Sequence, residues 1–122
     1  MTKHVITHVE LATTDTGATA AFYRALFGWD VQTYQPMDYV MANLGEGQTS
    51  IGFPIVNEYM KAGDTIVYVH TDDIDDSLAK AAELNAMVMM GKEFIPTVGH
   101  IAIVADPGGN KIAFMQPEMV VA

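Results

Sequence analysis

The spacing of apolar and polar residues divides the chain into strand-like and helix-like segments. Two segments follow the helical period, one at 16–27 and one running from Asp73 through Leu84. Runs rich in β-branched and aromatic residues predict strands at 4–12, 29–34, 38–44, 49–55, 65–70, 87–90, 100–105 and 111–116. The turn Asp106-Pro107-Gly108-Gly109-Asn110 separates the last two strands.

The first predicted helix has clear start and stop signals. Asp15 is placed to accept hydrogen bonds from the first free amides, and Gly28 is placed to adopt the left-handed conformation that ends a helix. Several small or apolar side chains fall on one side of this helix, and we expect that side to lie on a sheet: Ala18, Phe22, Ala25 and Leu26.

The two halves of the chain repeat the same order of elements. Asp73 minus Asp15 is 58 positions, and Leu84 minus Leu26 is also 58. Each half reads strand, helix, strand, strand, strand, and such a βαβββ unit cannot bury its sheet face alone. We therefore predict one α+β domain over residues 1–122, with module one at 4–56 and module two at 64–117. Curved mixed sheets should face each other around a cleft, with the helices outside, and the cleft is the expected ligand site.

Composition and charge narrow the classes of function. Half of the 122 residues are apolar, which is enough for a packed core, and the absence of cysteine excludes disulfides and thiolate sites. The net charge of −9 disfavours nucleic acid as a partner, because phosphate backbones would be repelled. No apolar stretch approaches the roughly 20 residues of a membrane span, and no leader is visible. We expect a cytoplasmic protein.

Local signatures then fall in the order of a known superfamily. The first half contains His8-Val9-Glu10-Leu11, Asp15, Ala21-Phe22-Tyr23 and Phe27-Gly28-Trp29. The second half contains Val69-His70-Thr71-Asp72-Asp73-Ile74, Glu93-Phe94-Ile95-Pro96, Val98-Gly99 and the segment 105–112. In this order they resemble the vicinal-oxygen-chelate superfamily of glyoxalase I, bleomycin-resistance proteins and extradiol dioxygenases. The match is nearest to its short glyoxalase-like branch and spans nearly the whole chain.

The resemblance implies a metal site that this sequence does not complete. Metal-dependent members hold a cation in the cleft through the first and fourth strands of each module, and the substrate chelates it through two adjacent oxygens. His8 stands at one of these positions. The other three fall at or near Gly52, at Ile66 and at Ala113, which carry no donor side chain. A divalent transition metal is normally held by about three protein ligands, so we expect no metal cofactor.

Six residues are candidates for ligand contact: His8, Glu10, Tyr68, His70, His100 and Met115. His8 is the candidate catalytic base or hydrogen-bond donor, and its alternative is a histidine held by a neighbouring backbone group. Glu10 could contact the ligand, or it could be solvated or paired with another group, and Tyr68 and Met115 could form a pocket wall or fill the core. His70 could lie at the rim or in the interior of the cleft. His100 could reach the cleft or lie at an edge of the sheet. A metal site of His8, His70 and His100 is a further alternative without a supporting motif.

These residues leave more than one function open. The first hypothesis is a small-molecule binding protein of the bleomycin-resistance type with a metal-free cleft. The alternative is a lyase or isomerase related to lactoylglutathione lyase, with His8 as base or as ligand of a weakly held metal. A scaffold for a regulatory metabolite is the third. The resemblance also implies a homodimer, and it leaves open whether one chain or two form the cleft.

Overall fold

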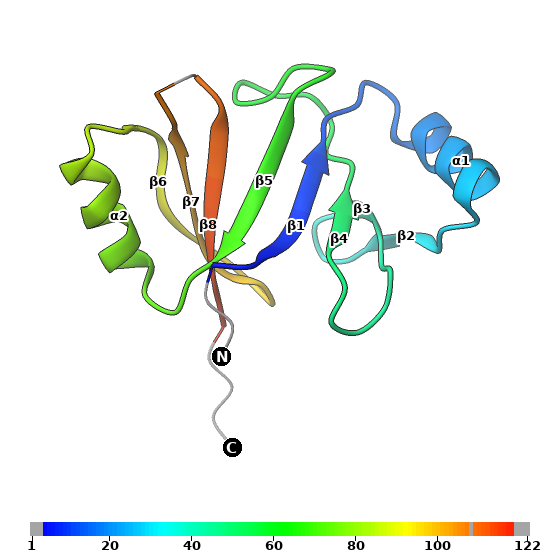
Figure 1. The fold of residues 1–122 in the computed structure, drawn as a ribbon. Helices are drawn as coiled ribbons and strands as arrows, with labels where there is room; N and C mark the ends of the chain where they lie inside the picture. The colour runs from blue at the N-terminus through cyan, green and yellow to red at the C-terminus, as the bar shows by residue number, and fades with distance from the viewer. Residues whose placement is uncertain (1–3, 108, 119–122) are drawn as a thin grey trace. The chain divides into compact units, whose positions relative to one another are not determined.

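The computed structural model describes residues 4–107 and 109–118. Figure 1 shows the order of its elements, which is strand, helix and three strands, repeated once. The elements are β1 (Ile6–Leu11), α1 (Thr16–Phe27), β2 (Val31–Tyr34), β3 (Tyr39–Ala42), β4 (Ser50–Gly52), β5 (Thr65–His70), α2 (Ile74–Glu83), β6 (Met87–Ile95), β7 (Gly99–Ala105) and β8 (Lys111–Pro117). The prediction of an α+β protein built from two βαβββ units is confirmed.

The described chain forms two compact units. The first unit is Thr7–Thr65, and the second is formed by the residues from Ile66 onward together with those before Thr7. The segment before Thr7 was predicted to belong with module one, but it contacts the second unit. Its Val5 carbonyl accepts a hydrogen bond from the His70 amide at 2.8 Å, and His4 Nδ1 lies 3.2 Å from the His70 carbonyl oxygen.

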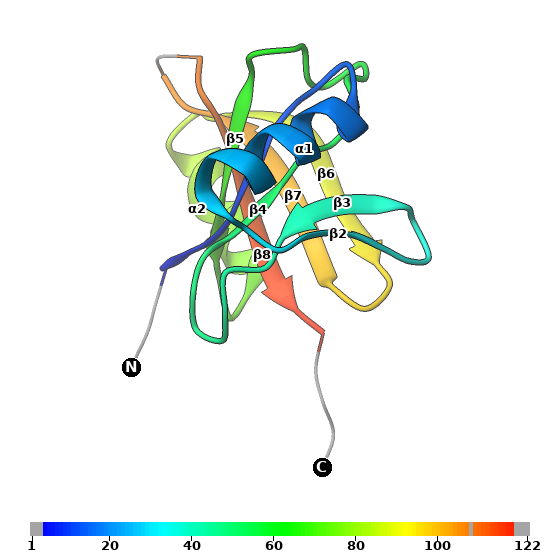
Figure 2. The same ribbon diagram turned by 90° about the vertical axis from the view of Figure 1, so that its right-hand side faces the viewer.

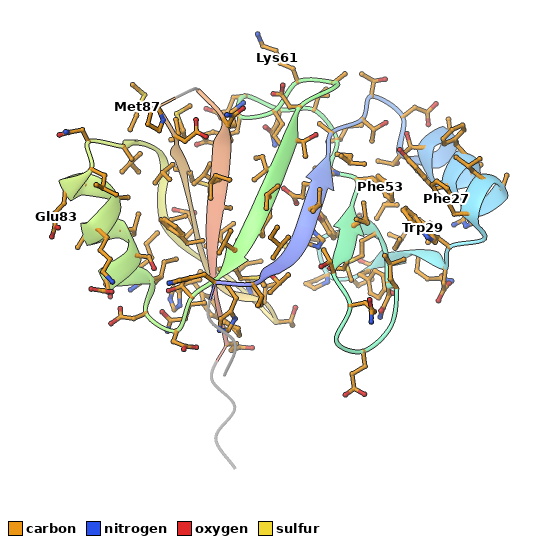
Figure 3. All side chains as sticks on the ribbon, in the orientation of Figure 1. Phe27, Trp29, Phe53, Lys61, Glu83 and Met87 are labelled. Atoms are coloured by element: carbon orange, nitrogen blue, oxygen red, sulfur yellow. The ribbon has the colours of Figure 1, made fainter. Side chains whose placement is uncertain are left out.

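The sheet of the first unit has the strand order β2-β3-β4-β1. Strands β1 and β4 are parallel, and the other pairs are antiparallel. Figure 2 shows α1 in front of this sheet, and the side chains between helix and sheet form the core. Tyr23 of α1 stacks on Phe53 at 5.1 Å and on Trp29 at 5.4 Å between ring centroids. Phe53 and Trp29 are labelled in Figure 3 beside α1. The buried members of the core are Ala20, Val31, Ala42 and Phe53.

Helix α1 begins and ends where the sequence predicts, but it packs on a different side. Asp15 accepts a hydrogen bond from the Ala18 amide at 3.0 Å, and Gly28 is left-handed at φ 71°. The predicted inner side is exposed, with Phe22 at 57% and Leu26 at 56%. The side on the sheet instead holds Ala20, which is buried, and Tyr23, which is half-buried. The prediction was wrong because α1 has apolar residues on two sides, and periodicity cannot say which one meets the sheet.

The sheet of the second unit has the order β5-β8-β7-β6, with β5 and β8 parallel and the other pairs antiparallel. Helix α2 buries Ile74 and Ala81. A hydrogen bond of 2.8 Å from the Ile74 amide to Gln116 Oε1 ties the start of α2 to β8. Strand β6 continues to Ile95, five residues past the predicted end at Met90, through two irregularities in its pairing with β7. Such bulges break the regular alternation by which a strand is recognised in a sequence.

The 58-residue repeat is preserved at atomic detail where each helix begins. Thr13 Oγ1 lies 2.7 Å from Thr19 Oγ1, and Asp15 is the N-cap of α1. At the equivalent positions, Thr71 Oγ1 lies 2.7 Å from Ser77 Oγ, and Asp73 is the N-cap of α2. Both cap residues have φ −148°, with ψ 96° and 92°. Among the described residues, no helix is long and apolar enough to cross a membrane.

Candidate functional site

The face of the first sheet that lies opposite α1 carries a group of polar side chains. His8 and Glu10 alternate on β1, and their partners on the parallel strand β4 are Ser50 and Gly52. Paired residues of neighbouring strands point to the same side of a sheet. The side chains of His8, Glu10 and Ser50 and the open side of Gly52 therefore share the face without a helix. Tyr39 of β3 reaches the same place, as its contacts with His8 and Glu10 show.

Three hydrogen bonds connect Ser50, His8, Tyr39 and Glu10, which we call the polar cluster. Ser50 Oγ lies 2.6 Å from His8 Nδ1, and His8 Nε2 lies 2.7 Å from Tyr39 Oη. Tyr39 donates to Glu10 Oε2 at 2.6 Å. Glu10 is buried, at 9% exposure. Residues far apart in the chain thus form one continuous chain of hydrogen bonds.

The protons of this cluster have a defined direction. The phenol of Tyr39 has a single proton and donates it to the Glu10 carboxylate. Tyr39 Oη must therefore accept from an N–H at His8 Nε2. A neutral imidazole carries one N–H, so His8 Nδ1 accepts from the Ser50 hydroxyl. The chain runs from Ser50 through His8 and Tyr39 to Glu10.

The environment of His8 favours its neutral form. Burial lowers the pKa of His8 from 6.5 to about 4, so the imidazole is uncharged at pH 7 and fits the arrangement of donors above. An effective general base has a pKa near the working pH. His8 is a weak base by this measure, and its basic nitrogen, Nδ1, already accepts a hydrogen bond from the Ser50 hydroxyl. The geometry favours a role in orienting Tyr39 and Glu10.

Gly52 provides the space in which Tyr39 lies. A Cβ atom at position 52 would overlap Tyr39 Oη and would lie 2.5 Å from Tyr39 Cζ and 2.7 Å from His8 Nε2. Any larger residue here would displace the phenol. The resemblance assigns the fourth-strand metal ligand to position 52. This residue is glycine, and the Tyr39 hydroxyl occupies the space that a side chain here would fill.

The residues at the implied metal positions do not fit a divalent transition metal. Of the four, His8 alone has a donor side chain, and both of its ring nitrogens are engaged by Tyr39 and Ser50. Ile66 and Ala113 are buried apolar residues, at 1% and 0% exposure. Within residues 4–107 and 109–118, no three His, Asp or Glu side chains gather closely enough to hold a metal ion.

In the second unit, three of the predicted site residues lie on the helix-free face. Strand register pairs Tyr68 with Ala113 and His70 with Met115, so Tyr68, His70 and Met115 point to one side. Tyr68 is buried, and His70 Nε2 lies 2.9 Å from Asp72 Oδ1 at the end of β5. Tyr68 and Met115 therefore share a face, as alternation predicts.

His100 lies on the opposite side of the same sheet. Its partner on β8 is Gln116, whose side chain contacts the start of α2, so His100 is on the helix side. Its ring packs against Phe94 at 5.2 Å. Because His70 and His100 point to opposite faces, they do not form one ligand set. The alternative of a metal site from His8, His70 and His100 is not supported by this arrangement.

A hollow of about 1180 Å³ lies between α2 and the sheet of the second unit. Its floor is apolar and includes Val69, Val104, Ile112 and Phe114. None of the six predicted site residues is among the described residues that line it. The hollow and the predicted site are therefore different places.

Sequence reasoning missed two members of the polar cluster, Tyr39 and Ser50. Strand alternation does not decide to which side Tyr39 points, and no motif includes Ser50. A signal was present in Gly52, because a glycine inside a strand often marks a close approach by another group. The identity of that group depends on contacts between residues 29 or more positions apart.

Comparison with known proteins agrees with this architecture. The sequence matches the Glyoxalase/Bleomycin resistance protein/Dioxygenase superfamily over residues 5–114. The chain belongs to this superfamily. It is also 31% identical over 116 residues to the protein named “Putative glyoxylase CFP32” of Mycobacterium bovis, and to the protein of the same name of Mycobacterium tuberculosis. The matched region covers 88% of this chain and 44% of either relative, so the chain spans less than half of their length.

Several solved structures share the fold of this chain. Methylmalonyl-CoA epimerase from Mycobacterium tuberculosis superposes with a TM-score of 0.75 at 14% identity, covering 98% of this chain and 93% of the epimerase. The epimerase of Streptomyces coelicolor superposes at 0.70 with 18% identity, covering 97% and 100%. A superfamily member from Vibrio splendidus gives 0.68 with 18% identity, covering 93% and 98%. At these identities the likeness concerns the fold.

Proposed function

We propose that this superfamily member is a small-molecule binding protein that holds its ligand at the polar cluster without a metal ion. The observation that carries the proposal is the place of Tyr39. Its hydroxyl fills the room beside Gly52 and engages His8, so hydrogen-bonding side chains stand where a metal-dependent member would hold its cation.

The energetics of the polar cluster support a function beyond folding. Burial lowers the pKa of His8 and so keeps its imidazole neutral, and Glu10 is buried beside it. Apolar residues could fill the same sheet face without the cost of burying polar groups, and perturbed groups of this kind concentrate at functional sites. The cluster combines hydroxyl, imidazole and carboxyl groups, so it suits a ligand with polar groups.

The first test is metal content, measured by elemental analysis of protein purified without a metal-affinity step. We expect no stoichiometric metal and no rise in melting temperature with Mn²⁺, Ni²⁺ or Zn²⁺. A library of aromatic and polar small molecules is then screened by thermal shift in chelator. Hits should lose affinity in Tyr39→Phe and keep it in Gly91→Ala, a strand glycine with open space around it. Near-stoichiometric metal, or binding that requires a divalent cation, would contradict the proposal.

A second candidate function is proton transfer at carbon, as in an isomerase or lyase. The specific observation in its favour is the continuous path of hydrogen bonds that ends at Glu10. In this version Glu10 takes the proton and His8 positions Tyr39, because the low pKa of His8 makes it a poor acceptor.

Hydrogen–deuterium exchange at carbon tests this candidate. Methylmalonyl-CoA is a reasonable first probe, since the epimerases with the same fold act on it by name. Exchange of its Cα proton in D₂O, followed by NMR, should stop in Glu10→Gln and persist at a reduced rate in His8→Asn. Exchange that is lost in His8→Asn and kept in Glu10→Gln would assign the base to His8 after all. The absence of cysteine supports a cytoplasmic setting for either function.

A further inference from the structure

The hollow beside α2 occupies the same point of its module as a smaller hollow beside α1. The smaller one has a volume of about 320 Å³, and the larger one, which we call the α2 hollow, has about 1180 Å³. Six residues that line the smaller hollow have their equivalents, 58 positions later, in the lining of the α2 hollow. These equivalents are Val69, Thr71, Asp76, Ser77, Lys80 and Ala81. The two hollows are therefore one repeated feature, which is wider in the second unit.

A difference between equivalent residues of the two helices explains the extra room. In the first unit, Tyr23 fills the space between helix and sheet, and its ring stacks on Phe53 at 5.1 Å and on Trp29 at 5.4 Å between centroids. The residue 58 positions after Tyr23 is Ala81, which lines the α2 hollow. A methyl group thus stands where the first unit has a phenol ring, and the space of the ring stays open.

The α2 hollow keeps contacts that suit an aromatic ring. Phe53 and Phe114 each follow the fourth-strand position of their module, and Phe114 lines the α2 hollow. Met87 is the equivalent of Trp29 by the offset of 58, and it lines the hollow while remaining 67% exposed. Aromatic rings and thioethers both make favourable contacts with an aromatic ring. A ring between helix and sheet would thus regain the type of packing that Tyr23 has in the first unit.

The rim of the α2 hollow is acidic. The charged groups among its described lining residues are four aspartates and one lysine: Asp72, Asp73, Asp76, Asp106 and Lys80. Lys80 lies 3.3 Å from Asp76, so it offsets one of the four negative charges. The carboxylates that remain attract a cation, and the apolar floor beneath them weakens the screening by water. A cation is therefore the charged group that this rim complements.

We propose that the α2 hollow is a second small-molecule site, separate from the polar cluster, that binds an arylalkylamine. The aromatic ring lies on Phe114 beside Ala81, and the ammonium group reaches Asp72 and Asp76 at the rim. Ala81 and Asp76 are five residues apart on α2, or about 7.5 Å along the helix axis, which a chain of three or four methylene groups can span. The volume of the hollow is comparable with the roughly 300–1,000 Å³ of small-molecule sites.

Three probes with one apolar body test the proposal: 4-phenylbutylamine, 4-phenylbutan-1-ol and 4-phenylbutyrate. Each is titrated into the full ¹⁵N-labelled chain and followed by two-dimensional NMR. The amine should bind with a dissociation constant on the order of 1 mM, as a fragment of this size does. It should bind at least tenfold more tightly than the carboxylate, because the rim attracts one and repels the other. The largest shifts should fall on the amides of Val69, Ala81 and Phe114.

Charge variants separate the rim from the overall charge of the protein. Asp72→Asn/Asp76→Asn should weaken binding of the amine about fivefold and leave the alcohol unchanged. Asp75→Asn/Glu83→Gln is the matched control, since it removes two charges from the same helix at residues that do not line the hollow. Figure 3 shows Glu83 on the side of α2 away from the sheet. The control should change the affinity less than twofold.

Variants of the apolar wall test the place of the ring. Ala81→Tyr restores the residue of the first unit and should abolish binding of the amine. Met87→Ser changes an exposed side chain, so it should stay folded, and it should weaken binding at least threefold. Leu26→Ser, at a residue that is 56% exposed in the other unit, is its control. Circular dichroism checks the fold of each variant, and if Ala81→Tyr is unfolded, Met87→Ser decides.

Several results would overturn the proposal. They are equal affinities for amine and carboxylate, shifts centred on Tyr39 and Ser50 of the polar cluster, an equal loss in the two charge variants, and a folded Ala81→Tyr or Met87→Ser that binds the amine as the wild type does.

Discussion

Replacing Gly52 with alanine is the sharpest perturbation of the polar cluster, because it adds one methyl group where Tyr39 lies. The new Cβ would overlap Tyr39 Oη and would approach His8 Nε2 to 2.7 Å. Tyr39 would have to move out, and its hydrogen bonds to His8 and Glu10 would break. Leaving a buried polar group unsatisfied costs about 1–3 kcal/mol, and two such groups remain. We expect the free energy of unfolding to fall by roughly 2–5 kcal/mol.

Urea unfolding of the wild type and variants measures this loss. Gly91→Ala in β6 is the matched control, since nothing lies within 4 Å of its added Cβ. It should be neutral or slightly stabilising, by about 0.4–1 kcal/mol, because alanine restricts the unfolded chain. Repeating Gly52→Ala in a Tyr39→Ala background should remove most of the penalty, which isolates the clash with the phenol. If Gly52→Ala costs no more than Gly91→Ala, the placement of Tyr39 in the room of Gly52 is refuted.

The remaining predictions concern the same cluster and the two helix caps. The pKa of His8 is about 4 in the folded chain and 6.5 when unfolded, so the neutral side chain contributes stability that is fully present above pH 6.5 and is lost as pH falls toward 4. The free energy of unfolding should therefore fall by roughly 3 kcal/mol between neutral and acidic pH. Urea unfolding at pH 7 and pH 4.5 should show most of this fall in the wild type and much less of it in His8→Asn. Tyr39→Phe should introduce no steric clash, but it should lower the free energy of unfolding by about 1–3 kcal/mol because two hydrogen bonds are lost. A decrease below about 0.5 kcal/mol in urea unfolding would argue against these two bonds. Asp15→Ala and Asp73→Ala should each destabilise the protein by about 1 kcal/mol, because the two caps have the same geometry, and unequal losses in thermal unfolding would contradict that equivalence.

Local patterns predict the elements of this protein well, and non-local contacts explain where they fail. Both helices begin at the capping residues that the sequence indicates, since a cap is set by residues three positions apart. The packing side of α1 was predicted wrongly because apolar residues occur on two of its sides. In the candidate site, His8 and Glu10 could be placed on one face from strand alternation. The link between them is Tyr39, which is 31 residues from His8 in the chain, and no local pattern carries that information.

Residues at matching positions of the two halves differ in character. The offset of 58 places Ile66 at the position of His8, and Tyr68 at the position of Glu10. Ile66 and Tyr68 of β5 are both buried, so the size of the side chain limits which residues fit there. At the matching positions of β1, the hydrogen bonds of His8 and Glu10 limit which residues fit. Matching positions of the repeat are thus subject to different physical requirements. The two copies should therefore tolerate different substitutions at matching positions: isosteric apolar changes in the second strand, and changes that preserve hydrogen bonds in the first.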